Sequence, residues 1–269
     1  MTNTFNNLLE CAQQLDQEDP LASLRDEFEM TVTPNGEEEI YLVGNSLGLL
    51  PLSSRDYMNA EMNKWGRLGV RGHAGTDREL DHPWSSYHEP INEQMAALTG
   101  AKPEEVVVMN GLTVNLHLMM VTFYRPNEKR YKILIEGHAF PSDHFAVESQ
   151  IRHHGLSSED ALVIVNPRPG EELIRYEDIA ALIEEHQDEL ALVLLPGIQY
   201  YTGQVFPMAD IVELGHQAGA IVGFDLAHAV GNIPLELHDW SADFAVWCNY
   251  KYVNGGPGAI AGCFVHEQH

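Results

Sequence analysis

The sequence predicts an α/β fold in which a mostly parallel, seven-stranded sheet is flanked by helices. Seven short apolar runs lie between residues 106 and 265, and each has the length of one strand. Each run is almost continuously apolar, as is typical of strands that are covered on both faces. Amphipathic segments of helical length separate most of the runs, and this alternation predicts parallel strands joined by crossover helices.

The strands and helices of this domain can be assigned from the apolar runs and the amphipathic segments. Strands are expected at residues 106–109, 131–136, 161–165, 190–195, 220–224, 243–248 and 259–265. Helices are expected at residues 112–124, 142–155, 175–187 and 208–219. Gly155 and Gly219 stand last in two of these helices, where glycine is common because it adopts the left-handed conformation.

The first hundred residues have a different pattern. Helical segments at roughly residues 5–18, 53–67 and 84–98 surround one short strand and turn at residues 39–51. We expect residues 1–100 to form an N-terminal arm that packs on the sheet domain or on a second subunit. Residues 101–269 are expected to form the large α/β domain, and because the chain stops just after the seventh strand, we expect a C-terminal domain to be missing.

The composition excludes several classes of protein. The chain of 269 residues is 44% hydrophobic, which is enough for a sizeable core, and its formal net charge is −25. Nucleic acids and anionic membranes are polyanions, so neither is an expected partner, although a small anion can still bind locally. The N-terminus lacks the pattern of a signal peptide, and no apolar run approaches the ~20 residues of a membrane span. The 3 cysteines form neither a disulfide framework nor a metal-binding pattern, so a cytoplasmic location is expected.

The histidines do not form a recognisable metal motif, although there are 14 of them. The sequences at residues 88–90 and 266–269 lack the spacing of the zinc-binding HExxH helix. His153 and His154 are adjacent, so they point away from each other on a helix. We therefore expect no metal.

Polar residues follow five of the expected strands. In open α/β sheets, ligands bind beyond the carboxyl ends of the strands. Because the five loops leave the same edge of the sheet, we expect their polar groups to converge on one site. The loops are residues 110–117, 137–144, 196–204, 225–229 and 249–258.

Lys251 and Asp225 suggest the chemistry of this site. Lys251 stands between two tyrosines where an apolar strand ends, and taken alone it is more simply a lysine at a solvated strand end. Asp225 follows a buried strand, and taken alone it is equally well a helix N-cap or the partner of a buried arginine. One strand-helix-strand step separates the two residues. This combination favours pyridoxal phosphate, which needs an amine for a Schiff base and a carboxylate for its ring nitrogen.

Three further residues have both a structural and a functional interpretation. Thr113 is most simply an N-cap, but a hydroxyl group and free N–H groups at a helix start can also hold a phosphate. Phe140 fits a core, and in a loop at a strand end it could instead stack on a flat ring. Asp143 is by default an acid in the first turn of a helix, where the helix dipole stabilises it.

Taken together, these motifs resemble those of the kynureninase family, pyridoxal 5'-phosphate enzymes of the aspartate aminotransferase fold (fold type I). The resemblance covers essentially the whole chain, and its last segment is highly specific. It implies hydrolysis of L-kynurenine to anthranilate and L-alanine, or of 3-hydroxy-L-kynurenine to 3-hydroxyanthranilate, in tryptophan catabolism and NAD synthesis. The matching segments are 41–51 (YLVGNSLGLLP), 110–120, 130–150, 200–206 (YYTGQVF) and 223–267.

The resemblance also implies catalytic roles for individual residues. Lys251 matches the lysine that forms the Schiff base, and Tyr250 matches a phosphate-binding tyrosine that is also a candidate acid or base. Asp225 matches the partner of the ring nitrogen, and His228 matches a further cofactor contact.

Other residues match cofactor and substrate contacts of the family. His73 resembles a histidine that contacts the substrate. The loop on the phosphate side and the segment that lies over the ring are matched by Leu112, Thr113, Phe140, Pro141, Ser142 and Asp143.

The sequence departs from the family pattern in two ways. Pro196 stands where family members often have serine or threonine, so a side-chain contact is lost. The family chain continues beyond the equivalent of residue 269 and there supplies a tryptophan, an asparagine and an arginine to the site. The alternative interpretation is therefore a truncated, catalytically incompetent chain that binds only cofactor or a partner chain. Family membership also implies a homodimer.

Overall fold

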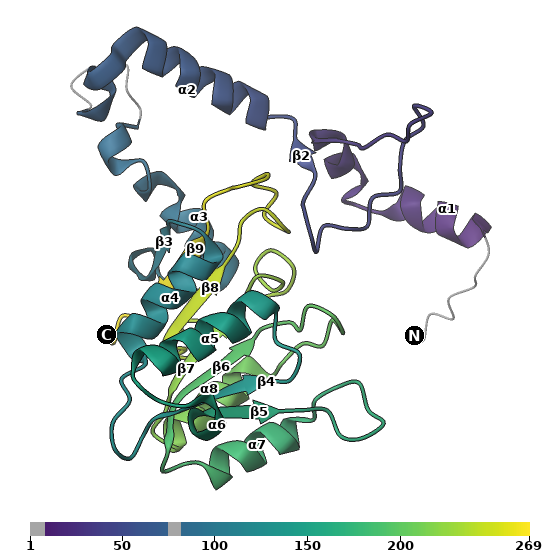
Figure 1. Cartoon of the computed structure of the whole chain (residues 1–269). Coiled ribbons are helices and arrows are strands. Elements are labelled where there is room, and N and C mark those ends of the chain that lie inside the picture. The colour runs from purple at the N-terminus through teal and green to yellow at the C-terminus, as the bar shows by residue number, and fades with distance from the viewer. Residues whose placement is uncertain (1–8, 75–81) are drawn as a thin grey trace. The chain divides into compact units, whose positions relative to one another are not determined.

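The structure is a computed structural model that describes residues 9–74 and 82–269 (Figure 1). Contacts divide the chain into two compact units. One comprises Met1–Leu42 and Leu49–Gly72, and the other comprises Val43–Gly48 and His73–His269. In the described part of the chain, every helix is too short or too polar for a membrane span.

The larger unit contains the sheet that the sequence predicts. Its seven strands lie in the order β3-β9-β8-β7-β6-β4-β5. Neighbouring strands from β8 to β5 run parallel, whereas β9 is antiparallel to both β3 and β8. The mostly parallel, seven-stranded sheet is therefore confirmed. The strands are β3 (Val106–Val108), β4 (Lys132–Glu136), β5 (Leu162–Val165), β6 (Leu190–Pro196), β7 (Ile221–Asp225), β8 (Phe244–Trp247) and β9 (Gly262–Val265).

Successive residues of a strand point to opposite faces of the sheet, and here the residues on both faces are apolar, so helices cover both faces. In β6, Leu192 and Leu194 belong to the apolar cluster that includes side chains of α4 and α5. Val193 and Leu195 belong to the other cluster, which includes side chains of α3, α7 and α8. The helices of this unit are α3 (Asn92–Thr99), α4 (Leu112–Phe123), α5 (Pro141–His153), α6 (Ser158–Ala161), α7 (Tyr176–Glu185) and α8 (Met208–Gln217), with short 3-10 helices η3 (Trp84–Ser86), η4 (Glu89–Ile91) and η5 (Pro103–Glu105) (Figure 1).

The C-terminal ends of α5 and α8 have the left-handed glycine that the sequence predicts. After α5, Gly155 has a φ of 74°, and the N–H of Leu156 donates to the carbonyl of Ile151. After α8, Gly219 has the same φ of 74°, and the N–H of Ala220 donates to the carbonyl of Gly215. These are Schellman ends, in which a left-handed residue satisfies the last free carbonyl groups of the helix.

The smaller unit consists of short elements and one longer helix. Its elements are α1 (Leu9–Glu18), the 3-10 helix η1 (Ala22–Glu27), β1 (Phe28–Glu29), β2 (Leu50–Pro51) and α2 (Ser54–Leu68), and the 3-10 helix η2 (Gly69–His73) follows α2. The expected helices therefore form at 54–68 and, within the described residues, at 9–18. The expected helix at 84–98 is divided, because η3 and η4 precede α3.

Two local features differ from what the sequence suggested. Within the expected strand and turn at residues 39–51, the strand forms at Leu50–Pro51 and not at the apolar residues before the turn, where Ile40 and Leu42 are 89% and 84% exposed. A strand needs a backbone partner, and only Leu50–Pro51 of this region pairs, with Phe28–Glu29. The short helix α6 was missed because four residues carry no periodic signal; its start is capped by Ser157, whose hydroxyl accepts from the N–H of Glu159.

The expected domain boundary near residue 100 stays a prediction. In the structure, α3 contributes Met95 and Ala96 to the apolar cluster that contains Val106 of β3. This helix therefore belongs to the unit that contains the sheet.

Candidate functional site

A cavity of about 260 Å³ lies at the carboxyl ends of the parallel strands. Its walls come from the start of α4 and from the segments that follow β4, β6, β7 and β8. These are the five loops in which the sequence places polar residues. The lining residues are Leu112, Thr113, Glu136, Phe140, Ser142, Asp143, Pro196, Ile198, Tyr200, Asp225, Ala227, His228, Tyr250 and Lys251.

Lys251 is buried in the wall of this cavity, with only 8% of its surface exposed. Its Nζ lies 3.1 Å from Nε2 of His228 and 5.8 Å from the ring centroid of Phe140. The Tyr250 ring is at a similar distance, 5.9 Å. Aromatic faces stabilise an ammonium group electrostatically, and this partly offsets the cost of burying it. Lys251 is therefore a buried amine that faces a cavity, and the interpretation as a solvated strand end was wrong.

His228 is a neutral imidazole beside this amine. Burial and the charge of Lys251 lower the pKa of His228, against the opposing effect of Asp225. Its Nε2 also lies 3.1 Å from the carbonyl oxygen of Asn45. With its proton on Nε2 the ring donates to Asn45, and with its proton on Nδ1 it accepts from Lys251.

The backbone around Lys251 is held by a compact turn. The carbonyl of Lys251 accepts from the N–H of Asn254, and the carbonyl of Asn249 accepts from the N–H of Gly255. Asn254 has a φ of 57°, in the left-handed region that asparagine tolerates better than most residues. The side chain of Asn249 adds a 2.7 Å bond to the carbonyl of Ile260.

The segment 43–48 packs directly on this turn. The N–H of Gly48 donates to the carbonyl of Tyr250 at 2.8 Å. A Cβ atom at Gly48 would lie 2.3 Å from the carbonyl oxygen of Lys251, so only glycine fits. The letters GNSLG at 44–48 match the G-x-S-x-G pattern of serine hydrolases, but no strand precedes the turn and no helix follows it, so the strand-turn-helix context of that motif is missing.

Asp225 and Asp143 form a pair of hydrogen-bonded carboxyl groups. Asp225 is the last residue of β7, and its Oδ1 accepts from the N–H of Ala227 at 2.7 Å. Asp143 is in the first turn of α5, and Ser142 Oγ donates to it at 3.2 Å. Burial, the negative charge of Asp225 and the hydrogen bond between the two side chains raise the pKa of Asp143 well above its usual range. The hydrogen bond between the two side chains needs a proton, which Asp143 keeps at neutral pH because its pKa is raised.

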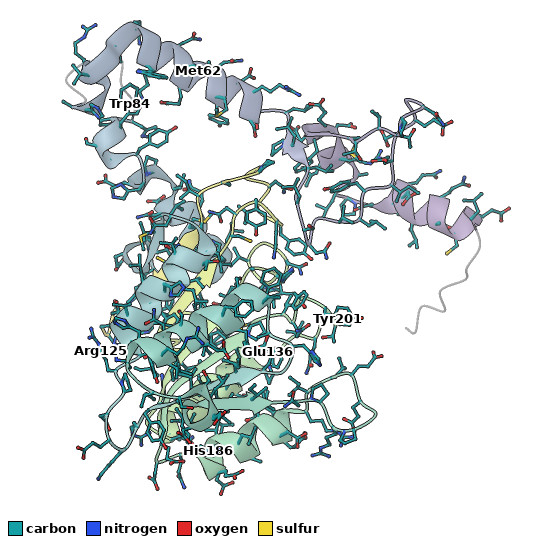
Figure 2. The ribbon with its side chains drawn as sticks, viewed as in Figure 1. Met62, Trp84, Arg125, Glu136, His186 and Tyr201 are labelled. Carbon is teal, nitrogen blue, oxygen red and sulfur yellow. The ribbon has the colours of Figure 1, made fainter. Side chains whose placement is uncertain are left out.

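Glu136 is a third carboxyl group in the cavity, and the sequence did not single it out. It ends β4 inside the unit that contains the sheet (Figure 2) and is 5% exposed. Burial, together with the charge of Asp225, raises the pKa of Glu136 to about 8, although its own backbone N–H lowers it somewhat. The available sequence signal was a glutamate as the last residue of an almost continuously apolar strand.

The start of α4 forms another wall of the cavity. Its N-cap is Gly111 rather than Thr113, so the interpretation of Thr113 as an N-cap was wrong. Leu112 and Thr113 are the first two residues of the helix, where N–H groups have no partner within the helix. Free N–H groups, a hydroxyl group and the positive end of the helix dipole together suit an anion.

Aromatic side chains also line the cavity. Phe140 is 46% exposed and meets Tyr200 edge to face, with the ring centroids 5.1 Å apart. Phe140 is therefore not a core residue. Burial raises the pKa of Tyr250 to about 12, so its phenol remains a hydrogen-bond donor at neutral pH.

Two predicted site residues do not line the cavity. Pro141 begins α5, where its fixed φ suits the first helical position. The His73 ring meets Trp84 edge to face at 5.4 Å, and its carbonyl accepts from Ser85 Oγ. The substrate contact of His73 stays a prediction.

One cluster outside the cavity has the composition of a metal site. Glu105, His238 and His266 have possible ligand atoms within 4.8 Å of one another. Glu105 already accepts from His238 Nδ1 and from the N–H groups of Lys102 and Glu267. Although burial acts to raise it, these bonds lower the pKa of Glu105. The carboxylate is satisfied without an ion, and the cluster connects η5 to the residues that follow β9.

Comparison with known proteins gives a matching family model and similar curated relatives. The family model described as Aminotransferase class-V matches residues 56–262. Kynureninase from Flavobacterium psychrophilum is 56% identical over 98% of this chain and 61% of its own length. Kynureninase from Nematostella vectensis is 48% identical over 97% of this chain and 57% of its own length. The chain therefore spans about three fifths of the length of these curated relatives.

Solved structures confirm the fold. A C-DES mutant with glycine covalently linked to its PLP cofactor has a TM-score of 0.69 and 16% identity, over 84% of this chain and 56% of that one. The apo structure of cysteine desulfurase from Thermococcus onnurineus NA1 has a TM-score of 0.68 and 19% identity, over 95% of this chain and 57% of that one.

Proposed function

The chain belongs to the class-V aminotransferase family, and on this premise we propose that it has the activity of a kynureninase. Such an enzyme uses pyridoxal 5'-phosphate to hydrolyse L-kynurenine or 3-hydroxy-L-kynurenine. The products are anthranilate or 3-hydroxyanthranilate, and L-alanine. The proposal is supported by the identity of 48% to 56% to kynureninases over nearly all of this chain.

The single observation that carries the proposal is the buried amine of Lys251 in a cavity that also contains Asp225. Lys251 is 8% exposed and has no ion pair with a carboxylate within the described residues, so its burial costs free energy. A protein retains such a cost where the amine has a function. An amine in such a place is suited to covalent chemistry, because it becomes nucleophilic when it loses its proton.

The rest of the cavity fits the cofactor in three respects. Its carboxyl pair, Asp143 and Asp225, can hold a protonated ring nitrogen. Its exposed aromatic ring, Phe140, offers a face to a flat heterocycle. Its free N–H groups at the start of α4 and the Thr113 hydroxyl can bind a phosphate.

The chain's own residues would then act as follows. When bound, pyridoxal phosphate supplies an aldehyde and a ring that accepts electron density from bonds broken in the substrate. Lys251 Nζ would hold the cofactor at its aldehyde carbon, and after the substrate's amine has taken its place it would carry a proton to and from the substrate's α carbon. His228 would accept a hydrogen bond from Nζ and so orient it, while Asp225 would hold the ring nitrogen. Tyr250 keeps its proton at neutral pH, so it can donate a hydrogen bond to the phosphate or a proton to the reaction.

The finer parts of the proposal rest on the resemblance to kynureninases. They are a homodimer, a cytoplasmic location, a place in tryptophan catabolism and NAD biosynthesis, and a substrate contact by His73. Nucleic acid and membranes are not proposed as partners, because the net charge of −25 disfavours polyanions.

The proposal is tested by adding pyridoxal phosphate and L-kynurenine to the purified chain. We expect a visible absorption band from the covalently bound cofactor and anthranilate fluorescence from turnover. Lys251→Ala should lose both signals, whereas Lys129→Ala, an exposed lysine outside the cavity, should keep both. A band without turnover would favour the alternative, a chain that binds cofactor only. No band with the wild-type chain would contradict the proposal.

A further inference from the structure

Glu136 is a buried titratable group of the cavity that the proposed reaction does not use. It ends β4, next to β5 and β6, and its side chain opens into the cavity rather than toward solvent. Within the described residues, no cation forms an ion pair with it, and its own backbone N–H is its hydrogen-bond donor. Pro196, which ends β6, lies in the wall between β4 and β7 and offers neither a hydroxyl nor an N–H group.

The groups that face Glu136 make its ionisation unfavourable. Asp143 faces it from α5, and Asp225 faces it from the end of β7. The other titratable groups of the cavity are His228, which is neutral, together with Tyr250 and Lys251. Three ionised carboxylates against one ammonium would leave two uncompensated negative charges in a buried site. Such charges cost several kcal/mol each in proteins, so the site must keep protons.

We propose that Glu136 is a positioning residue that keeps its proton at neutral pH and thereby limits the negative charge at the Asp143–Asp225 pair. One ionised carboxyl group then balances the ammonium of Lys251. The pair keeps one shared proton and one negative charge for a ligand's protonated ring nitrogen. This role for the pair rests on the proposed function, whereas the proton on Glu136 does not, because it follows from the cavity alone.

The coupling between these groups acts in both directions. The charge of Asp225 raises the pKa of Glu136, and the charge of Glu136 raises the pKa of Asp143. When Glu136 ionises near pH 8, the pair therefore holds its shared proton more tightly. With a neutral residue at position 136, the aspartate pair should release its shared proton at a lower pH.

The experiment follows the carboxyl groups by NMR in the full chain without cofactor, with ¹³C labels at glutamate Cδ and aspartate Cγ. In the wild type, we expect one glutamate to titrate near pH 8, several units above the ordinary value of about 4.3. Glu136→Gln should abolish this titration and move the upper step of the aspartate pair down by roughly one pH unit. Asp225→Asn should lower the glutamate midpoint. Glu148→Gln, which removes a glutamate paired with Arg152 on α5, should change neither titration.

Several outcomes would overturn the inference. One is that every glutamate of the wild-type chain titrates below about pH 6; this test does not depend on the folding of a variant. Another is an aspartate step that stays at the same pH in Glu136→Gln, since a purely structural glutamate would leave that step unmoved. If these titrations occur but pyridoxal phosphate does not bind, the inference stands and the proposed function fails.

Discussion

Replacement of Gly48 by alanine should disturb the turn that carries Lys251. A Cβ atom at this position would lie 2.1 Å from Asn254 Oδ1 and 2.3 Å from the carbonyl oxygen of Lys251. The Asn254 side chain can rotate away, but the carbonyl oxygen belongs to the backbone of the turn. The segment 43–48 must therefore move by about 1 Å to reach ordinary contact distance, which threatens the 2.8 Å bond from Gly48 N–H to Tyr250.

The magnitude follows from these two effects. The lost hydrogen bond contributes about 1 kcal/mol, and steric strain of this kind typically costs about 1–3 kcal/mol. We therefore expect Gly48→Ala to lower the free energy of unfolding by about 2–4 kcal/mol. Because the same shift displaces Lys251, the dissociation constant for pyridoxal phosphate should rise by at least about tenfold.

Urea denaturation followed by circular dichroism measures the first effect, and titration of the visible absorption band measures the second. Gly66→Ala is the matched control, since a Cβ atom there meets nothing within 4 Å and alanine favours the helix α2 by roughly 1 kcal/mol. If Gly48→Ala unfolds at the wild-type urea concentration and binds the cofactor with unchanged affinity, the close packing of segment 43–48 on the turn is refuted.

Three further predictions concern the sheet and the carboxyl groups. The folded-state pKa of Glu136 is raised to about 8, so the stability it contributes is present below about pH 4.5 and is lost as the pH rises through 8. When the pH is raised from 5 to 8.5, the free energy of unfolding measured in urea should therefore fall by about 3–4 kcal/mol less in Glu136→Gln than in the wild type. An equal fall in both proteins would contradict the prediction. Gly262→Ala would bring a Cβ atom to 2.3 Å from the Trp247 ring, and we expect an unfolding free energy lower by about 1–3 kcal/mol, whereas an unchanged value would show that the ring can move. Under the proposed function, Asp225→Asn should lower L-kynurenine hydrolysis by at least about 10²-fold while the covalent cofactor band remains, and a wild-type rate would exclude the ring-nitrogen role.

The strands were predictable because this sheet is covered on both faces. A run such as residues 190–195 is apolar throughout, and the structure buries it from Leu190 to Leu195. The order of the strands was not predictable, because it depends on which edges pair and on the reversal of β9 between β3 and β8. Within the expected strand and turn at residues 39–51, the apolar residues indicated β structure, but the strand forms at Leu50–Pro51, where Phe28–Glu29 supplies a paired backbone.

The candidate site was predictable where chemistry and topology coincide. Lys251, Asp225, Thr113, Phe140 and Asp143 follow four different strands, and the rule that ligands bind at the carboxyl ends predicted their convergence. Glu136 was missed because its significance depends on what surrounds it, and a glutamate at a strand end is usually solvated. Only the tertiary structure shows that it shares a cavity with two other carboxyl groups and one amine.

The most direct test of this account is the chemical location of the cofactor. Reduction of the pyridoxal phosphate complex with borohydride fixes the cofactor on the amine to which it is bound, and peptide mapping then identifies that residue. We expect the label on the peptide that contains Lys251 and on no other. A label on another lysine, or an unlabelled chain, would contradict the assignment of the buried amine as the cofactor's attachment point.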